Sequence, residues 1–254
     1  CVIENGTNAV VFNNSSPTIS NSVLQNNQDE AIVCDDSSPT ITGNHILNNP
    51  VGIDMDPGSQ PTITSNTFTS NEQPIKIYAQ HINGNVYGNT YDNNLLPDST
   101  VSDFIWVYGS DNDQSEAHVR GDFVYDWLAD GAPYKIMDPI TFFGAVHDWI
   151  PTLRLHPEVE LVFEPNTGLY FGAGTDQWGA LQADSVLFTS SSAETHWDGI
   201  HFNNYTRDQD TYIHGCVIEN GTNAVVFNNS SPTISNSVLQ NNQDEAIVCD
   251  DSSP

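Results

Sequence analysis

Apolar and polar positions follow a fixed order over the first hundred residues, and the order repeats. The tripeptide Pro-Thr-Ile begins at Pro17, Pro39 and Pro61, so both steps have the same length. An Asn follows each tripeptide, at positions 21, 44 and 66. Short apolar runs such as AVVF (9–12) and AIVC (31–34) lie between clusters of Asn, Asp, Ser and Gly. This pattern predicts short strands separated by turns, and it has no helical period of about 3.6 residues.

The length of the period indicates a solenoid. A repeat of about 22 residues that holds two or three short strands is one turn of a coil, and each turn stacks on the next at the strand spacing of about 4.8 Å. The recurring Asn residues are expected to form ladders at the bends, because Asn tolerates bend conformations and stacked amides bond one another. Two columns are expected inside the coil, one of Ile19, Ile41 and Ile63 and the other of Val11, Val33 and Met55.

The motif PTIxxNxIxxN, present as PTISNSVLQNN and PTITGNHILNN, resembles the right-handed parallel β-helix repeats of the pectin lyase-like superfamily. The segment LRLHPEVELVFEPNTGLYFGAG (153–174), then GALQADSVLFTSSS and HWDGIHF, is similar to the less regular coils of large bacterial or archaeal surface and secreted proteins. In that part Val162, Leu181 and Ile200 are evenly spaced, as coils would require. The resemblance implies an all-β fold, a right-handed single-stranded parallel β-helix with about 19–25 residues per coil. It implies little about function, since the superfamily holds lyases, hydrolases, tail spikes and adhesins.

A second repeat is longer and has no substitutions. Residues 1–39 recur unchanged as residues 216–254. Exposed Asn and Ser would not stay identical through drift, so we expect tandem 215-residue units, of which 1–215 is one. The chain begins at Cys1 and stops at Pro254 inside a PTI motif, and no cap is visible at either end, which favours a longer array. We expect one continuous β-helix over 1–254, with regular PTI coils in 1–100, less regular coils in 101–215 and the start of the next unit in 216–254.

The charge of the chain excludes some classes of binding partner and favours others. The net charge of −28 comes from 33 acidic residues against 5 basic ones, while charged residues make up only 15% of the chain. The imbalance therefore reflects missing Lys and Arg. A surface this negative repels nucleic acid and anionic lipid and attracts divalent cations. No apolar run approaches the length of a membrane span, so we expect no membrane insertion.

Pairs of carboxylates at predicted turns are the candidate metal ligands. Calcium, held loosely, is the expected ion, and we expect no other cofactor. The candidate ligands are Asp35, Asp36, Asp54, Asp56, Asp111 and Asp113. The alternative is that these are solvated turn residues. In a strict 22-residue register Asp56 falls opposite Cys34 and Asp36 opposite Gly58, which predicts that no column of carboxylates forms.

Catalysis of the pectate lyase type uses clustered acidic residues that hold calcium, with Arg or Lys as the base, as the resemblance implies. The basic residues lie outside the regular PTI coils except Lys76 at their end, so we predict no catalytic residue and no enzyme. A polysaccharide lyase or hydrolase is the runner-up. Exposed aromatic side chains at Trp178, Trp197 and Tyr205, lining a groove beside an acidic pair, would favour it.

The four cysteines are two pairs of copies, Cys1 and Cys34 with Cys216 and Cys249. Cys1 and Cys34 are separated by one and a half coils, which places them too far apart for a disulfide within the unit. In the repeat Cys34 takes the place of Phe12 and Cys1 that of Ser22, which favours small buried residues. The alternative is a crosslink between neighbouring molecules through any of the four thiols that face outward.

Together these features predict a structural module of a giant extracellular or cell-surface fibrous protein, which forms a filament by end-to-end stacking with itself as partner. N-glycosylation sequons beginning at Asn5, Asn14 and Asn204 agree with that location. The alternatives are a carbohydrate-binding or carbohydrate-cleaving pectin lyase-like β-helix and an adhesin stalk. A carbohydrate partner belongs to the first of these.

Overall fold

The computed structural model describes residues 1–109, 117–144, 149–192 and 194–254. Two compact units make up the chain: unit 1 is Cys1–Asp111 with Ala129–Tyr134, and unit 2 is Asn112–Leu128 with Lys135–Pro254. Besides strands, the described residues contain two single-turn 3-10 helices, η1 (Ala79–His81) and η2 (Asp208–Asp210), and no α-helix. The predicted all-β fold is therefore confirmed.

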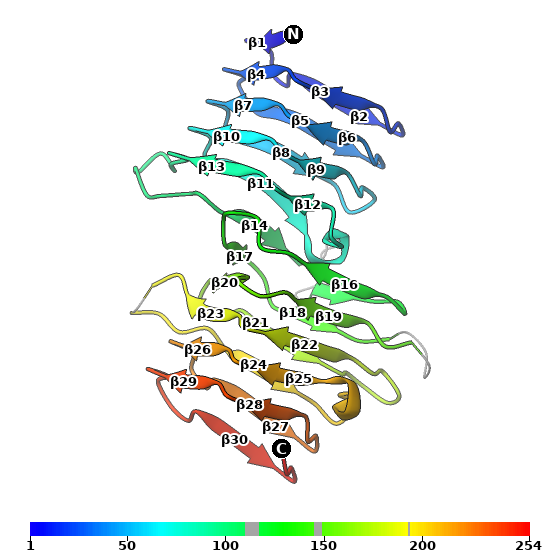
Figure 1. Cartoon of the computed structure of the whole chain (residues 1–254), viewed down its shortest axis with the longest axis vertical. Coiled ribbons are helices and arrows are strands. Elements are labelled where there is room, and N and C mark those ends of the chain that lie inside the picture. Colours follow the sequence, from blue (N-terminus) through cyan, green and yellow to red (C-terminus); the bar gives the residue numbers. More distant parts are fainter. Residues whose placement is uncertain (110–116, 145–148, 193) are drawn as a thin grey trace. The chain divides into compact units, whose positions relative to one another are not determined.

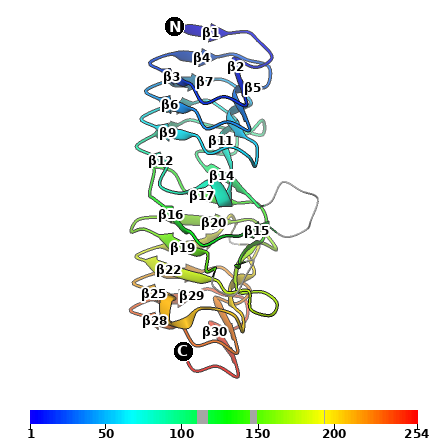
Figure 2. The ribbon, with the colours of Figure 1, turned by 90° about the vertical axis from the view of Figure 1, so that its right-hand side faces the viewer.

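Unit 1 is built from three walls, each formed of parallel strands. Figure 2 shows one wall, with β3, β6, β9 and β12 lying one above another. One wall is β1 (Val2–Glu4), β4 (Val23–Gln25), β7 (His45–Leu47), β10 (Thr67–Thr69) and β13 (Thr90–Asp92). The second is β2 (Val10–Asn13), β5 (Glu30–Asp35), β8 (Val51–Met55), β11 (Gln73–Tyr78) and β14 (Ile105–Tyr108). The third is β3 (Thr18–Ser20), β6 (Thr40–Thr42), β9 (Thr62–Thr64) and β12 (Val86–Tyr87). Because the chain visits each wall in turn and then returns one strand further on, the unit is a parallel β-helix.

Unit 2 is built in the same way, as Figure 1 shows in green to red. Its first wall is β15 (Ala117–Val119), β18 (Ile140–Phe142), β21 (Gly168–Phe171), β24 (Gly199–Phe202), β27 (Val225–Asn228) and β30 (Ile247–Asp250). Its second is β16 (Val124–Trp127), β19 (Thr152–Leu155), β22 (Ala180–Asp184), β25 (Tyr212–His214) and β28 (Thr233–Ser235). Its third contains β20 (Glu160–Phe163), β23 (Leu187–Ser190), β26 (Val217–Glu219) and β29 (Val238–Gln240). Strand β17 (Tyr134–Ile136) falls where the chain passes from unit 1 to unit 2.

Asn ladders at two bends hold the coils of unit 1 together, as the sequence predicts, except that Asn21 is not a member and Ser22 donates its backbone N–H to Asn44 in its place. Each ladder residue donates its backbone and side-chain N–H groups to the side-chain oxygen of the next member at 2.7–3.1 Å. One ladder is Asn44, Asn66, Asn89 and Asp130, and the other is Asn27, Asn49, Asn71, Asn94 and Asp103. Both ladders end on a carboxylate, which accepts these N–H groups and has no donor of its own to satisfy.

Inside unit 1 the column of Ile19, Ile41 and Ile63 is confirmed by the register of β3, β6 and β9. The predicted column of Val11, Val33 and Met55 is wrong. Val11 pairs with Val33 but is 56% exposed, and the next residue in that register is Asp54. These positions face outward because side chains alternate along a strand, and the inward column on the same wall is Phe12, Cys34 and Met55.

The coils of unit 2 that precede the repeated segment 216–254 are longer than the sequence predicts. Leu181 pairs with Leu153, Val162 with Thr189, and Ile200 with Leu169. The even spacing of Val162, Leu181 and Ile200 is therefore a coincidence, since the three belong to three different walls. Hydrogen bonds between these coils include pairs 28 and 30 residues apart, Arg154 to Gln182 and Thr189 to Glu219, whereas the coils of 216–254 return to steps of 21 and 22 residues. Stacked aromatic rings fill the wider interior, with centroids 5.3–5.5 Å apart along Phe142, Phe171, Phe202 and Phe227.

The two identical 39-residue segments adopt the same local structure. β1, β2, β3 and β4 have counterparts in β26, β27, β28 and β29, each shifted along the chain by the same offset. Positive φ recurs at the same positions, for example 62° at Asn5 and 59° at Asn220, and 44° at Asp36 and 47° at Asp251. Phe12 pairs with Cys34 as Phe227 pairs with Cys249. The sequence of this segment thus specifies one coil geometry in both units. That residues 216–254 begin a further unit, and that 1–254 is one continuous solenoid, stay predictions.

Candidate functional site at the turns and outer walls

Three carboxylates meet at a turn of unit 1, named here the acidic turn: Asp35, Asp36 and Asp56, with one oxygen of each within 4.8 Å of the others. Asp56 Oδ1 accepts the backbone N–H of Asp36 at 3.1 Å and the hydroxyl of Ser59 at 2.6 Å. Desolvation and the neighbouring charges of Asp56 and Asp36 raise the pKa of Asp35. A group of carboxylate oxygens is the donor set of a hard divalent cation such as calcium.

The acidic turn corrects the prediction that no carboxylates gather. Asn27 and Asn49 are 22 residues apart, but Glu30 pairs with Val51 at a step of 21, and Ser37 and Ser59 are again 22 apart. The coil therefore loses one residue before β8 and regains it after β8. That shift places Asp56 beside Asp35, where a constant 22-residue register places it beside Cys34.

Of the other predicted ligands, Asp54 lies on β8 and has a different partner. Its carboxylate pairs with the Lys76 ammonium at 3.2 Å. Burial raises the pKa of Asp54 and the Lys76 charge opposes that rise. Burial is the largest single influence on Lys76 and lowers its pKa, but the charge and hydrogen bond of Asp54 together with the charges of Tyr78 and Tyr108 outweigh burial, so the net direction is upward. Asp111 and Asp113 lie outside the described residues.

His and Cys side chains form no group of three or more with their donor atoms close together in the described residues. The acidic turn is the one group there of three or more His, Cys, Asp or Glu side chains that could hold an ion. Cys34 and Met55 are neighbours in the core, 0% and 1% exposed. Burial raises the pKa of Cys34 to about 12, so its thiol stays protonated and is a poor metal ligand at neutral pH.

A polar row follows the outer face of one wall of unit 2. Asp126, Arg154 and Gln182 are register partners on β16, β19 and β22. Arg154 Nη1 lies 3.4 Å from the Asp126 carboxylate and Nε donates to Gln182 Oε1 at 3.0 Å, while His156 Nε2 lies 2.8 Å from the same Asp126 oxygen. A lyase would need a group of carboxylates that holds calcium beside such a base, and the row of Asp126, Arg154 and Gln182 contains one carboxylate. We assign no catalytic residue here.

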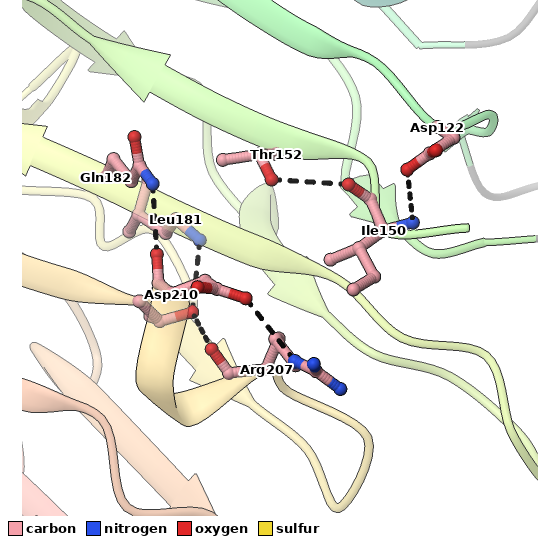
Figure 3. Close-up of polar contacts among 8 residues, drawn as sticks. Asp122, Ile150, Thr152, Leu181, Gln182, Arg207 and Asp210 are labelled. Atoms are coloured by element: carbon pink, nitrogen blue, oxygen red, sulfur yellow. Dashed lines mark hydrogen bonds and ion pairs between the residues drawn. The ribbon is translucent and has the colours of Figure 1, made fainter. Parts of the chain in front are cut away.

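The polar contacts continue onto a loop beside this row, as Figure 3 shows. Gln182 Nε2 donates to the backbone carbonyl of Asp210 at 3.2 Å, and Arg207 Nε donates to the Asp210 carboxylate at 3.3 Å. The Arg207 guanidinium also lies 5.8 Å from the ring centre of Trp178, which meets Tyr205 edge to face at 5.5 Å. These contacts order the loop and leave both aromatic rings half-buried.

The third aromatic candidate is a core residue. Trp197 is 0% exposed, stacks on Phe163 at 4.1 Å and donates its indole N–H to the backbone carbonyl of Glu219 at 2.9 Å. It cannot line an outer groove. The sequence could not separate it from Trp178, because both lie near Gly and Asp in irregular segments.

The last predicted site residues are the cysteines and the asparagines of the sequons. No disulfide joins the four cysteines: Cys34 and Cys216 are buried, and Cys1 and Cys249 are exposed. Their role as crosslinks between molecules stays a prediction. The three sequon residues are exposed: Asn5, Asn14 and Asn204. Their glycosylation also stays a prediction. Among the described residues, no helix has the length and apolar character needed to cross a membrane.

Comparison with known proteins gives one partial match. A family model described as "Periplasmic copper-binding protein (NosD)" matches residues 1–118. The match covers less than half of the 254 residues. No curated protein and no solved structure matches the chain.

Proposed function

Because the chain is a parallel β-helix protein of the pectin lyase-like superfamily, we propose that it is a structural repeat module whose 215-residue units join into a filament outside the cytoplasm. The observation that carries the proposal is the identical sequence of residues 1–39 and 216–254, together with the matching bounds of β1–β4 and β26–β29. A solenoid coil is stabilised mainly by its neighbours, so a segment that forms the same coil twice is suited to mark the junction between units.

The location is supported by the family match, whose description is periplasmic. That description also names copper, and copper sites use Cys, His or Met donors. In residues 1–118, as far as they are described, the sulfur-bearing side chains of Cys34 and Met55 are register partners, and both are buried in an apolar column. The carboxylates of the acidic turn are hard donors. The residues present therefore do not fit a copper site, and our proposal does not include copper.

Sedimentation velocity of the 254-residue chain at rising concentration tests the proposed assembly. We expect the chain to form species larger than one molecule, and a variant that ends at residue 215 to lose them, because it lacks the repeated segment. A single species with the mass of one chain at every concentration would contradict the module proposal.

A second candidate, carbohydrate binding, is favoured by one observation. Trp178 and Tyr205 present half-buried rings beside Arg207 and Asp210, and such a combination binds sugars through ring faces and charged hydrogen-bonding groups. The net charge of −28 favours neutral glycans over polyuronates. Tryptophan fluorescence titrated with neutral oligosaccharides checks this candidate, with Trp178→Ala as the matched variant. Unchanged fluorescence of the native chain across a panel of neutral glycans would remove it.

A further inference from the structure

The dipeptide Asn-Gly occurs three times in the chain: Asn5-Gly6, Asn83-Gly84 and Asn220-Gly221. This dipeptide can modify itself, because the backbone nitrogen of the Gly can attack the side-chain carbonyl of the Asn before it. Gly has no side chain to hinder that attack. The three dipeptides therefore share one intrinsic chemistry, and only their surroundings in the fold distinguish them.

Two of the three Gly nitrogens are held by an Asn side chain of the neighbouring coil. The backbone N–H of Gly6 donates to Asn27 Oδ1 at 3.2 Å, and that of Gly221 donates to Asn242 Oδ1 at 3.0 Å. The carbonyl of each Gly also accepts the backbone N–H of the residue after that Asn, at 2.9 and 2.8 Å. A peptide bonded in this way on both sides must break hydrogen bonds before its nitrogen can attack.

The bend that contains Asn83-Gly84 is held through a different nitrogen. This bend lies between η1 and β12. Asn85 Oδ1 accepts the backbone N–H of Asn83 at 2.8 Å, and Asn85 Nδ2 donates to the carbonyl of Pro61 on the neighbouring coil at 2.7 Å. The amide of Asn85 thus binds the nitrogen one residue before the one that would attack. Within the part of the chain that the structure describes, the backbone N–H of Gly84 donates no hydrogen bond.

Exposure alone does not separate the three sites. Asn5 and Asn83 are both exposed, and Asn220 is half-buried. Water, the second reactant, therefore has access to Asn5 as well as to Asn83. The difference between these two is the hydrogen bond at the Gly nitrogen.

We propose that Asn83-Gly84 is a site of spontaneous deamidation in the folded protein, and that the bonds to Asn27 and Asn242 protect the other two dipeptides. Gly84 N attacks Asn83 Cγ and gives up its proton, the bond from Cγ to Nδ2 breaks, and ammonia leaves with that proton. One water then opens the cyclic imide at either carbonyl, which yields aspartate or isoaspartate. The reaction consumes water, releases ammonia and changes no oxidation state.

Either product alters this bend of unit 1. The new carboxylate adds one negative charge to a chain whose net charge is −28. Isoaspartate also inserts one methylene into the main chain between Asn83 and Asn85, whose backbone nitrogen and side-chain oxygen are 2.8 Å apart. The insertion displaces Asn85 from its partners, so we expect the bend that leads into β12 to loosen. Deamidation would thus mark the age of a molecule at one bend.

Peptide mapping by mass spectrometry tests the assignment. Trypsin cuts after Lys76, Arg120 and Arg207, so the three dipeptides fall on different peptides. The chain is incubated in mildly alkaline buffer, once folded and once in concentrated urea, and the conversion of each Asn to acid is followed with time. A sample digested at the start corrects for deamidation during the digest.

In urea we expect the three rates to agree within about twofold, because the fold no longer distinguishes the sites. In the folded chain we expect Asn83 to react about tenfold faster than Asn5 and Asn220, since a hydrogen bond must first break at those two. Enzymatic methylation of the isoaspartyl carboxyl group should label the peptide that contains Asn83. Asn83→Gln should remove that label, because Gln would have to close a larger and slower ring.

A matched pair of variants tests the protection itself. Asn242→Ala removes the acceptor of the Gly221 N–H, whereas Asn242→Asp keeps a carboxylate oxygen there. We expect Asn220 to react about tenfold faster in Asn242→Ala and to stay slow in Asn242→Asp. Asn5, whose bond to Asn27 is intact, should stay slow in both variants, which shows that each remains folded.

Two results would overturn the proposal. If Asn83 reacts no faster than Asn5 in the folded chain, the bend is not a site of deamidation. If Asn220 stays slow in Asn242→Ala while Asn5 is also slow, the hydrogen bond is not what protects the dipeptide. Both measurements are made on single molecules in dilute solution, so neither depends on the proposed filament.

Discussion

At the scale of single residues, the side chains that carry this fold are amides whose donors and acceptors are both used. Asn71 is 0% exposed, accepts two N–H groups from Asn49, and donates to Asn94 and to the carbonyls of Ile46 and Thr69. Such a network is favourable only when every member is satisfied, because a buried unpaired N–H costs about 1–3 kcal/mol. The recurrence of Asn is visible in the sequence, so this part of the fold could be predicted.

Replacing Asn71 by Ala should therefore destabilise the chain strongly. The change removes the acceptor for both donors of Asn49, and we expect a loss of about 2–4 kcal/mol in the free energy of unfolding. Urea denaturation followed by circular dichroism measures it. Gln60→Ala is the matched control: Gln60 is exposed and donates its backbone N–H to Ser38, which the change leaves in place, so its loss should stay within about 0.5 kcal/mol. Equal effects of the two changes would contradict the ladder's role.

The acidic turn shows what residue patterns alone could not predict. Its third carboxylate, Asp56, lies beside Asp35 because the coil has one residue fewer before β8 and one residue more after β8 than a constant 22-residue register requires. Insertions that compensate each other within one coil leave the spacing of the PTI motifs unchanged. The sequence period therefore contains no sign of them.

Calcium should raise the melting temperature of the native chain, and Asp56→Asn should remove most of that rise. The reason is that Asp56 completes the three-carboxylate group, and calcium affinity depends on the number of charged ligands. Asp251→Asn is the control, because Asp251 is the counterpart of Asp36 in the copy whose described residues hold no such three-carboxylate group. Scanning calorimetry with calcium and with a chelator decides the matter. A rise that survives in Asp56→Asn, or that is absent from the native chain, would refute a site at this turn.

At the scale of secondary-structure elements, the bends set the coil as much as the strands do. One bend has positive φ, between 48° and 68°, at Asn21, Gly43, Ser65 and Gly88 in successive coils. Gly adopts this conformation without steric cost, and Asn or Asp adopts it at a lower cost than other residues. The strands and bends of unit 1 could be predicted because they keep this chemistry at every turn. In unit 2 the loops vary in length, as between Phe171 and Ala180, and no spacing rule identifies the strand that follows.

Ser65 is the position at which this bend can be tested without altering the ladder residue that follows it. Ser65→Val should cost about 1–2 kcal/mol of folding free energy, because a β-branched side chain clashes in the left-handed region. Ser65→Asn should be neutral or stabilising, since Asn occupies the equivalent bend at residue 21. Chemical denaturation of the two variants compares them. A Val variant as stable as the Asn variant would show that the bend is not restrained by its backbone conformation.

At the scale of the whole molecule, the charge governs how stability responds to pH. Burial is the leading cause that raises the pKa of several carboxyl groups: Glu30, Asp35, Asp54, Asp130, Glu160 and Asp208. The pKa of Asp98 is instead lowered, by its bonds to Thr100. A group whose pKa is higher in the folded state binds its proton more tightly there. Its ionisation therefore costs stability above the folded pKa, and that cost disappears as the pH falls toward the ordinary values of 3.8 for Asp and 4.5 for Glu.

The melting temperature should accordingly rise when the pH is lowered from 7 toward 5. Protonation also reduces the self-repulsion of a chain with a net charge of −28, which acts in the same direction. Thermal melts at constant ionic strength across this range provide the measurement. A melting temperature that falls steadily over the same range would mean that carboxylates with lowered pKa values dominate the fold.

We propose that this β-helix continues from one molecule to the next, and cryo-electron microscopy of the assembled chain tests that continuity. We expect filaments in which strands run across the axis in layers about 4.8 Å apart, with the layers unbroken at the joint between molecules. Discrete single-chain particles at every concentration, or filaments whose joints interrupt the layers, would contradict it.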